Sequence, residues 1–206
     1  TMNNKVIFSL YREFVKRDFS TLRFNFRGVG KSQGSYDDGE GELTDAATAM
    51  DWIQTQNPSA THCWVAGFSF GSWIGMQLMM RRPEIKGFIS LSAPALTRDF
   101  AFLAPCPSSG LFIHGSDDEI VPSLALSRVL EKISIQKGAV IKDIIIQGAD
   151  HFFNDHNNEM IDAVGKYLDT RLDKDGNYIS QEDFITGPLV PIHDIPKYQS
   201  PPKTYV

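Results

Sequence analysis

This sequence of 206 residues has no long apolar run, no excess of basic charge and only two cysteines. Each of these absences excludes a class of protein. No apolar run reaches the roughly 18 residues that a membrane-spanning helix needs, and the first residues lack a secretion signal. The net charge of -5 offers no basic surface to nucleic acid or to an anionic membrane. We therefore expect a cytoplasmic protein with no nucleic-acid partner and no membrane partner.

The two cysteines, Cys63 and Cys106, are too few for a disulfide framework or a zinc site. Each stands at the edge of an apolar run, so we expect both thiols to be buried packing groups. The hydrophobic content of 42% is sufficient for one sizeable core. The sequence contains no repeat of fixed period.

Short apolar runs alternate with longer amphipathic ones, which is typical of a mostly parallel sheet with helices on both faces. The predicted strands cover residues 21–26, 62–67, 86–92, 110–114 and 140–146. The predicted helices cover residues 6–14, 42–56, 69–80, 121–133 and 159–172. The fold class is therefore α/β, with one domain over residues 1–172 and a polar, proline-rich surface tail over residues 173–206.

The pentapeptide GFSFG at residues 67–71 places Ser69 between a predicted strand and a predicted helix. In such a turn, small neighbours let the chain bend sharply, and the serine hydroxyl is lifted out of the sheet. We expect Gly67 and Gly71 to provide that room, and the Phe70 amide to point at the place where an oxyanion forms. Ser69 is the predicted nucleophile, and an ordinary tight turn with a capping serine is the alternative.

A serine nucleophile needs a base and usually a carboxylate that orients the base. Two later strands end in loops that carry such groups, Asp117 and Asp118 in one loop and His151 in the other. The order serine, acid, histidine is the one found in α/β-hydrolases. His151 is the predicted base. Asp117 and Asp118 compete as the acid, and Asp117 is also typical of a residue that bonds its own turn.

The other histidines have weaker claims to a catalytic role. His114 precedes the turn that presents the acid, and we interpret it as a satisfied residue at a strand end. His62, His156 and His193 have no nearby companions, so we expect surface or packing roles for them.

Two further segments resemble ligand-binding motifs but lack residues that those motifs require. Residues 28–32 resemble the end of a phosphate-binding loop, but Asn25 stands where the first glycine is required. Residues 173–180 resemble the start of a calcium-binding loop. Tyr178 stands at the sixth position, where that loop requires glycine, and Phe184 stands at the twelfth, where it requires a bidentate glutamate. We expect a glycine-rich turn in the first case, with Arg27 anchoring neighbouring loops, and a polar turn in the second.

Taken together, these segments resemble a family of small bacterial α/β-hydrolases without a large cap, distantly similar to dienelactone hydrolases and carboxylesterases. The resemblance covers residues 1–172 and rests on TMNNKV, LRFNFRGVGKSQGSYDDGEGE, AGFSFGSWIGMQL, HGSDDEIVP and GADHFF. It implies an α/β-hydrolase fold with Asp118 as the acid and His151 as the base. Most members have only a general hydrolase activity assigned, so the resemblance implies a mechanism rather than a substrate.

The chain differs from the family at the amino terminus. Relatives carry further strands and a His-Pro-x-Pro-x-x-Gly-Gly-like loop just before the position of Thr1, and this loop supplies a second oxyanion amide. The strand before that loop lies, in relatives, between the strands that end here at Phe26 and Gly67. A gap there would leave costly unpaired backbone groups. We therefore expect that amino-terminal strands are missing from this chain and that the natural protein is longer.

The predicted function is that of a serine-dependent carboxylic ester hydrolase acting on a small ester-like molecule, with no metal or organic cofactor. A thioesterase or peptidase with the same triad is the alternative, as is a non-catalytic binding protein of the same fold. A homodimer is an assembly that the sequence leaves open. The short connection between residues 92 and 108 leaves no room for a large lid. A set of apolar residues near the site either lines an acyl pocket or belongs to the core: Phe100, Phe102, Leu103, Phe152 and Phe153.

Overall fold

The computed structural model of the protein describes residues 1–134 and 138–186. Its elements, in chain order, are α1 (Lys5–Val15), α2 (Glu40–Gln56), β1 (Cys63–Phe68), α3 (Phe70–Met79), β2 (Ile85–Leu91), a 3-10 turn η1 (Ala101–Leu103), β3 (Gly110–Gly115), α4 (Ser123–Ser134), β4 (Ile141–Ile146), α5 (Asn157–Asp169) and α6 (Gln181–Thr186). The predicted α/β class is confirmed, and each predicted helix is present near its expected bounds.

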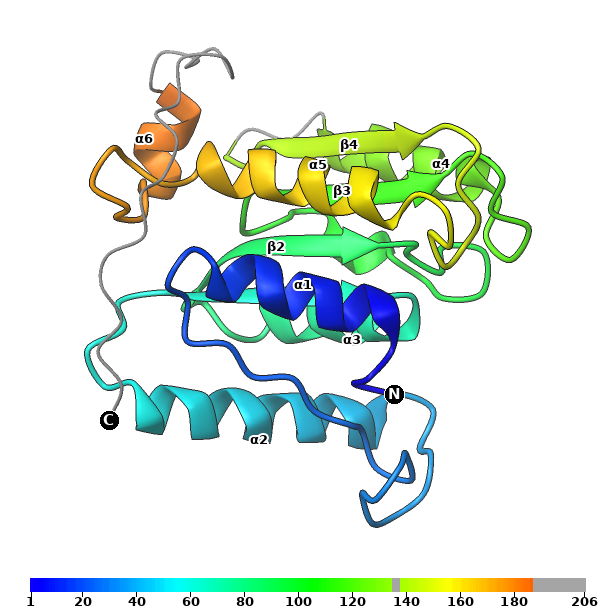
Figure 1. The fold of residues 1–206 in the computed structure, drawn as a ribbon, viewed down its shortest axis with the longest axis horizontal. Coiled ribbons are helices and arrows are strands. Elements are labelled where there is room, and N and C mark those ends of the chain that lie inside the picture. Colours follow the sequence, from blue (N-terminus) through cyan, green and yellow to red (C-terminus); the bar gives the residue numbers. More distant parts are fainter. Residues whose placement is uncertain (135–137, 187–206) are drawn as a thin grey trace.

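The four strands of the described sheet are all parallel and lie in the order β1-β2-β3-β4. Their carboxyl ends therefore meet at one edge, where the arrowheads point in Figure 1. The two central strands, β2 and β3, are buried along almost their whole length because helices cover both faces. Loops that follow the strands converge at this edge, which is where such sheets bind ligands.

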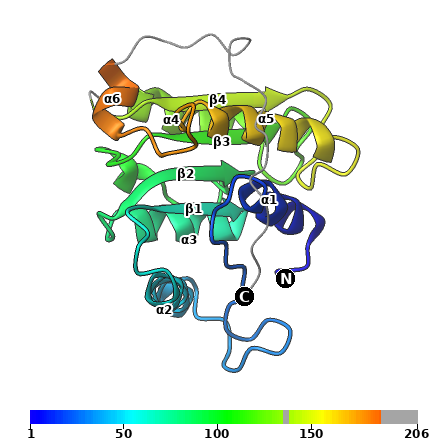
Figure 2. The same cartoon turned by 60° about the vertical axis from the view of Figure 1, so that its left-hand side comes forward.

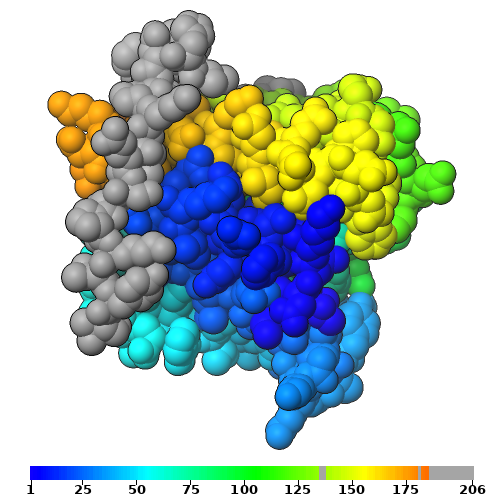
Figure 3. Space-filling model, viewed as in Figure 1, coloured from blue at the N-terminus to red at the C-terminus, as the bar shows by residue number. Residues whose placement is uncertain are grey.

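The helices form two layers, one on each face of the sheet (Figures 1 and 2). On one face α1 and α5 lie side by side, as the space-filling view in Figure 3 also shows. In α1, Val6, Leu10 and Phe14 fall on one face of the helix and are buried against the sheet. On the other face α3 covers β1 and β2, α4 packs on β4, and α2 packs on α3. Each face thus has its own apolar core.

The predicted strand over residues 21–26 is wrong. These residues belong to no strand, and no backbone hydrogen bond joins them to β1 within the described chain. Two adjoining grooves of about 640 and 480 Å³ separate the segment from β1, and both are lined by Val65 and Ala66. Ala66 is exposed although it stands in the middle of a strand. A β-strand is stabilised by backbone hydrogen bonds to a neighbouring strand. Residues 21–26 have the alternating pattern of a strand but no neighbouring strand to pair with.

The direction of the backbone groups of β1 follows from its pairing. The amides of Cys63 and Ser69 donate to Glu84 and Leu91, on the β2 side. Because these groups alternate along a strand, the amides and carbonyls of Ala66 and Phe68 face the grooves instead. The open edge of β1 agrees with the expectation that amino-terminal strands are absent from these residues.

The segment after α5 is tied to the amino ends of the strands. Arg171 is fully buried and donates to the carbonyl of Lys86 and to the hydroxyls of Tyr167 and Tyr178. Burial raises the pKa of Tyr167 to about 12. Residues 173–177 form a polar turn in which the Asp173 carboxylate accepts backbone amides. Residues 181–186 form helix α6, which the expectation of a surface tail did not include. Residues 187–206 of the expected tail lie outside the described residues.

The two thiols differ in their environment. Cys106 is buried, and burial raises its pKa to about 11. Cys63 is only half-buried, beside Gln54 and the larger groove, so the expectation that both are buried is wrong for Cys63. Across the described residues, no helix has the length and apolar character to cross a membrane.

Candidate active site

Ser69 occupies the sharp bend between β1 and α3, with φ 51° and ψ -122°. This is a left-handed backbone conformation that non-glycine residues rarely adopt and that is typical of strained functional sites. A side chain at Gly67 would overlap the backbone of Gly71 and Ser72, so the bend requires glycine there. No atom lies within 4 Å of a Cβ placed at Gly71. The expectation that both glycines make room holds for Gly67 and is wrong for Gly71.

A chain of hydrogen bonds joins Ser69, His151 and Asp118. Ser69 Oγ lies 3.0 Å from His151 Nε2, and His151 Nδ1 lies 2.7 Å from Asp118 Oδ2. The other Asp118 oxygen accepts the amides of Ile120 and Val121 at 2.9 and 2.7 Å. Both His151 and Asp118 are 4% exposed. The structure therefore brings the three predicted residues together in the order of contact that general-base catalysis by histidine requires.

The neighbouring Asp117 has a different role. Its carboxylate accepts the Ser116 hydroxyl at 2.7 Å, and its amide donates to the Ala149 carbonyl at 3.0 Å. The Ser116 hydroxyl also accepts the Gly148 amide at 2.7 Å. Asp117 thus bonds its own turn and joins the loop after β3 to the loop after β4, while Asp118 alone contacts the histidine.

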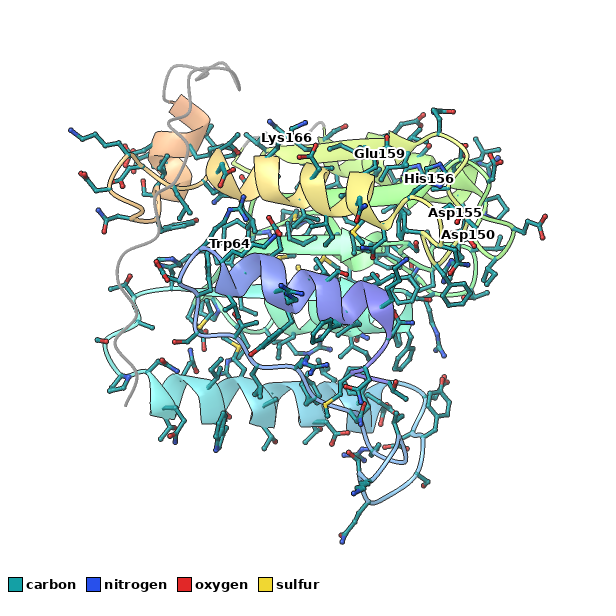
Figure 4. All side chains as sticks on the ribbon, in the orientation of Figure 1. Trp64, Asp150, Asp155, His156, Glu159 and Lys166 are labelled. Carbon is teal, nitrogen blue, oxygen red and sulfur yellow. The ribbon has the colours of Figure 1, made fainter. Side chains whose placement is uncertain are left out.

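The loop that carries His151 is itself tightly fixed. Asp150 accepts the amide of Asn154, and this backbone hydrogen bond lowers the Asp150 pKa. Phe153 has a φ of 52°, and its side chain is fully buried. Figure 4 labels Asp150, Asp155 and His156 at the carboxyl edge of the sheet, where this loop leads into α5. These contacts fix the backbone on both sides of His151.

The other histidines lie elsewhere. His114 is buried on β3, with Nδ1 3.3 Å from an Asp143 oxygen, but neither ring nitrogen has hydrogen-bond geometry to a described partner. The interpretation of His114 as a satisfied residue is therefore wrong. His62 packs on Tyr178 with ring centroids 4.2 Å apart, and burial lowers its pKa. His156 precedes α5 at its N-cap, and His193 lies outside the described residues.

Aromatic rings flank the candidate base and the oxyanion donor. The centroids of Phe68 and Phe152 lie 5.2 and 5.1 Å from that of the His151 ring, and Phe152 is 42% exposed. Phe100 and Leu103 are fully buried in the core. Of the residues that could have formed an acyl pocket, Phe152 is therefore the one that presents a large apolar surface beside the histidine.

A cluster of side chains that no sequence motif predicts lies beside Phe70. The Arg98 guanidinium lies 4.6 Å from the centroid of the Trp73 ring and 5.7 Å from that of Phe70. It donates to the Tyr36 hydroxyl at 2.6 Å and to the Asp38 carboxylate at 2.7 Å. The cluster joins the loops before α2 and after β2 across the start of α3. No local motif marks it, since its members are distant in sequence and individually ordinary.

The chemistry that this arrangement allows is acyl transfer. A serine hydroxyl beside a carboxylate-oriented histidine can attack a carbonyl, and the Phe70 amide at the helix start can donate to the resulting oxyanion. Arg27 bonds Asp45 on α2 through its backbone amide and its guanidinium, and the guanidinium lies 3.6 Å from the carboxylate of Asp37 in the preceding loop. Among the described residues, no group of three metal-ligating side chains is close enough to hold an ion.

Comparison with known proteins places the chain among relatives of this kind. Residues 5–109 match the family model for serine aminopeptidase, S33. A protein of unknown function from Agrobacterium tumefaciens, provisionally assigned as an alpha/beta hydrolase, is 53% identical with a TM-score of 0.82, over 83% of this chain and 78% of its own. An alpha-beta serine hydrolase homologue from Coxiella burnetii is 34% identical with a TM-score of 0.75, over 82% and 78%. A serine hydrolase without lid from Xanthomonas campestris is 33% identical with a TM-score of 0.72, over 80% and 72%.

Proposed function

We propose that this chain, which belongs to the serine aminopeptidase S33 family of α/β-hydrolases, is a serine-dependent carboxylic ester hydrolase that acts through an acyl-enzyme on Ser69. The observation that carries the proposal is the continuous hydrogen-bonded chain from Ser69 through His151 to Asp118. A non-catalytic protein would have no need of a strained serine aligned on a buried histidine–carboxylate pair.

The mechanism follows from the positions of the groups. His151 Nε2 takes the hydroxyl proton as Ser69 Oγ attacks the ester carbonyl, and the imidazolium then returns that proton to the departing alcohol. Water, deprotonated by the same nitrogen, attacks the acyl-enzyme and releases the carboxylic acid. Asp118 holds the ring through Nδ1 and stabilises the imidazolium without accepting the proton.

The Phe70 amide is the oxyanion donor that these residues supply. It belongs to the first residue of α3, directly after the strained Ser69. A preorganised donor of this kind is worth about 3 to 4 kcal/mol of transition-state stabilisation.

The surroundings of the site favour a small ester with an apolar group. Phe68 and Phe152 offer ring surface beside the base. The short connection after β2 forms no large lid, which leaves the serine accessible. Cleavage of an amino-terminal residue from a peptide is the second candidate, favoured by the description of the family model.

A panel of substrates tests the proposal. We expect nitrophenyl esters of short acyl chains to be hydrolysed, and aminoacyl nitroanilides to be cleaved much more slowly or not at all. A fluorophosphonate probe should label the protein and the Ser72→Ala variant, but not Ser69→Ala. Ser72 is a matched control because it is a buried serine on α3 whose hydroxyl has no described partner. Faster cleavage of nitroanilides would favour the aminopeptidase, and an unlabelled wild-type protein would refute both enzymes.

A further inference from the structure

Ser92, the residue after β2, is a buried serine in a backbone conformation that non-glycine residues rarely adopt. Its φ is 45°, and it is 1% exposed. Two of the other described non-glycine residues with positive φ, Ser69 and Phe153, belong to the nucleophile bend and to the loop of the base. Outliers of this kind persist where the surrounding structure holds them, and they cluster at functional sites.

The turn formed by Leu91 and Ser92 contacts the segment of each triad member. The Leu91 carbonyl accepts the amide of Ser69 at 2.8 Å. The Ser92 amide donates at 2.9 Å to the carbonyl of Ile113, on the strand that leads to the acid. The Ser92 hydroxyl donates at 2.9 Å to the carbonyl of His151, in a buried contact.

These three bonds depend on the conformation of Ser92. Its amide continues the ladder toward β3, while its side chain reaches the loop after β4. The Leu91 carbonyl meanwhile accepts the Ser69 amide and so holds the nucleophile from the β2 side. One turn therefore sets the spacing between the residue that attacks and the residue that takes its proton.

We propose that Ser92 is a positioning residue for the hydrolysis, and that its hydroxyl holds the backbone of His151 at the distance the nucleophile needs. The inference rests on the proposed function. Without the hydroxyl, the buried His151 carbonyl would lack this donor, and the loop would shift to find another. A misplacement of about 1 Å in a reacting group can lower a rate by about a hundredfold.

Two substitutions separate the hydroxyl from the backbone strain. Ser92→Ala removes the hydroxyl and keeps a side chain in the strained conformation, whereas Ser92→Gly removes the hydroxyl and relieves the strain. Ser108→Ala is the matched control, because the Ser108 hydroxyl makes an equivalent buried bond of 2.7 Å to the Ile85 carbonyl, at the opposite ends of the strands. Circular dichroism is the control that tests whether each variant is folded.

We expect the rate of fluorophosphonate labelling to fall at least tenfold in both Ser92 variants and to change less than threefold in Ser108→Ala. For a nitrophenyl ester, kcat should fall in the Ser92 variants while KM stays within about twofold, since the groups that contact the ester are unchanged. A purely structural role would lower thermal stability in all three variants and leave kcat intact. If Ser92→Ala fails to fold, Ser92→Gly alone decides the question.

Labelling of Ser92→Gly at the wild-type rate would overturn the proposal, because it would show that the hydroxyl is dispensable. If the wild-type protein and Ser108→Ala do not react either, the proposed function fails separately. The positioning role is then decided by crystal structures of the wild type and Ser92→Ala. An unchanged distance between Ser69 Oγ and His151 Nε2 would refute it.

Discussion

Replacing Gly67 by alanine should displace the nucleophile bend, and the size of the effect can be worked from the contacts. The added Cβ would overlap the Gly71 carbonyl and lie 2.6 Å from Ser72 Cα. An ordinary carbon–carbon contact is roughly 3.5 Å, so the start of α3 must move by about 0.9 Å. All the atoms involved belong to the backbone, so a change of side-chain rotamer cannot relieve the overlap. Overpacking of this kind costs about 1 to 3 kcal/mol of folding stability.

The same displacement should lower activity more than stability. Ser69 and Phe70 stand between the two crowded segments, so movement of α3 shifts both the hydroxyl and the oxyanion donor. A shift of about 1 Å predicts a loss of about a hundredfold in the labelling rate with a fluorophosphonate. Thermal unfolding and labelling of the same purified protein measure the two effects independently.

Gly71→Ala is the matched control within the same motif. A Cβ at Gly71 meets no atom within 4 Å, and alanine in a helix is favoured over glycine by up to about 1 kcal/mol. This variant should therefore unfold at the wild-type temperature or above it, and should keep most of its labelling rate. The reasoning would be refuted if Gly67→Ala were labelled at the wild-type rate, or if Gly71→Ala lost as much stability as Gly67→Ala.

Three further predictions concern the acid, the buried thiol and the apolar surface. Asp118→Asn should lower kcat by about 10³ to 10⁴ through loss of the histidine orientation, while Asp117→Asn should lower it less than tenfold; equal losses in steady-state assays would contradict the assignment. Burial raises the Cys106 pKa to about 11, so the thiol ionises at a lower pH in the unfolded chain than in the folded one. The contribution of this thiol to folding stability is therefore fully present below about pH 9 and is lost as the pH rises to about 11. Denaturant unfolding should show this loss, of about 3 kcal/mol at most, and Cys106→Ala should show a flatter alkaline profile; parallel profiles would exclude the thiol as the cause. Phe152→Ala should raise KM for nitrophenyl esters of longer acyl chains about threefold to tenfold, in line with the loss of about 1 kcal/mol of aromatic contact, and should leave acetate esters unaffected; an equal effect on both esters would place Phe152 outside the acyl site.

The candidate triad could be predicted because each of its members follows a strand, and each strand has a strong local pattern. Ser69 stands in a motif of five residues, and the loops of Asp118 and His151 come directly after apolar runs. The choice between Asp117 and Asp118 could not be made from spacing, since a one-residue difference in a loop depends on the backbone conformation. The family resemblance favoured Asp118, and the contact of 2.7 Å with the histidine is the physical basis for it.

Ser92 and Arg98 could not be predicted from the sequence because their contacts are not local. The Ser92 hydroxyl bonds a carbonyl 59 residues later in the chain. Arg98 bonds Tyr36 and Asp38, which lie about 60 residues earlier. Serine and arginine at loop positions are common, and nothing in their neighbours marks a positive φ or an aromatic stack. Such residues become visible only when the loops are placed against one another.

The failed strand prediction has its origin at the open edge of β1, which ends beside the nucleophile. Alternation along β1 directs the backbone groups of Gly67 and Ser69 toward β2 and those of Ala66 and Phe68 toward the grooves. Any strand that paired with this edge would also face residues 21–26 and could turn them into a strand. Its last residues would pair near Phe68, one residue from the nucleophile. The open edge of β1 therefore ends within two residues of the Phe70 amide that serves the oxyanion position.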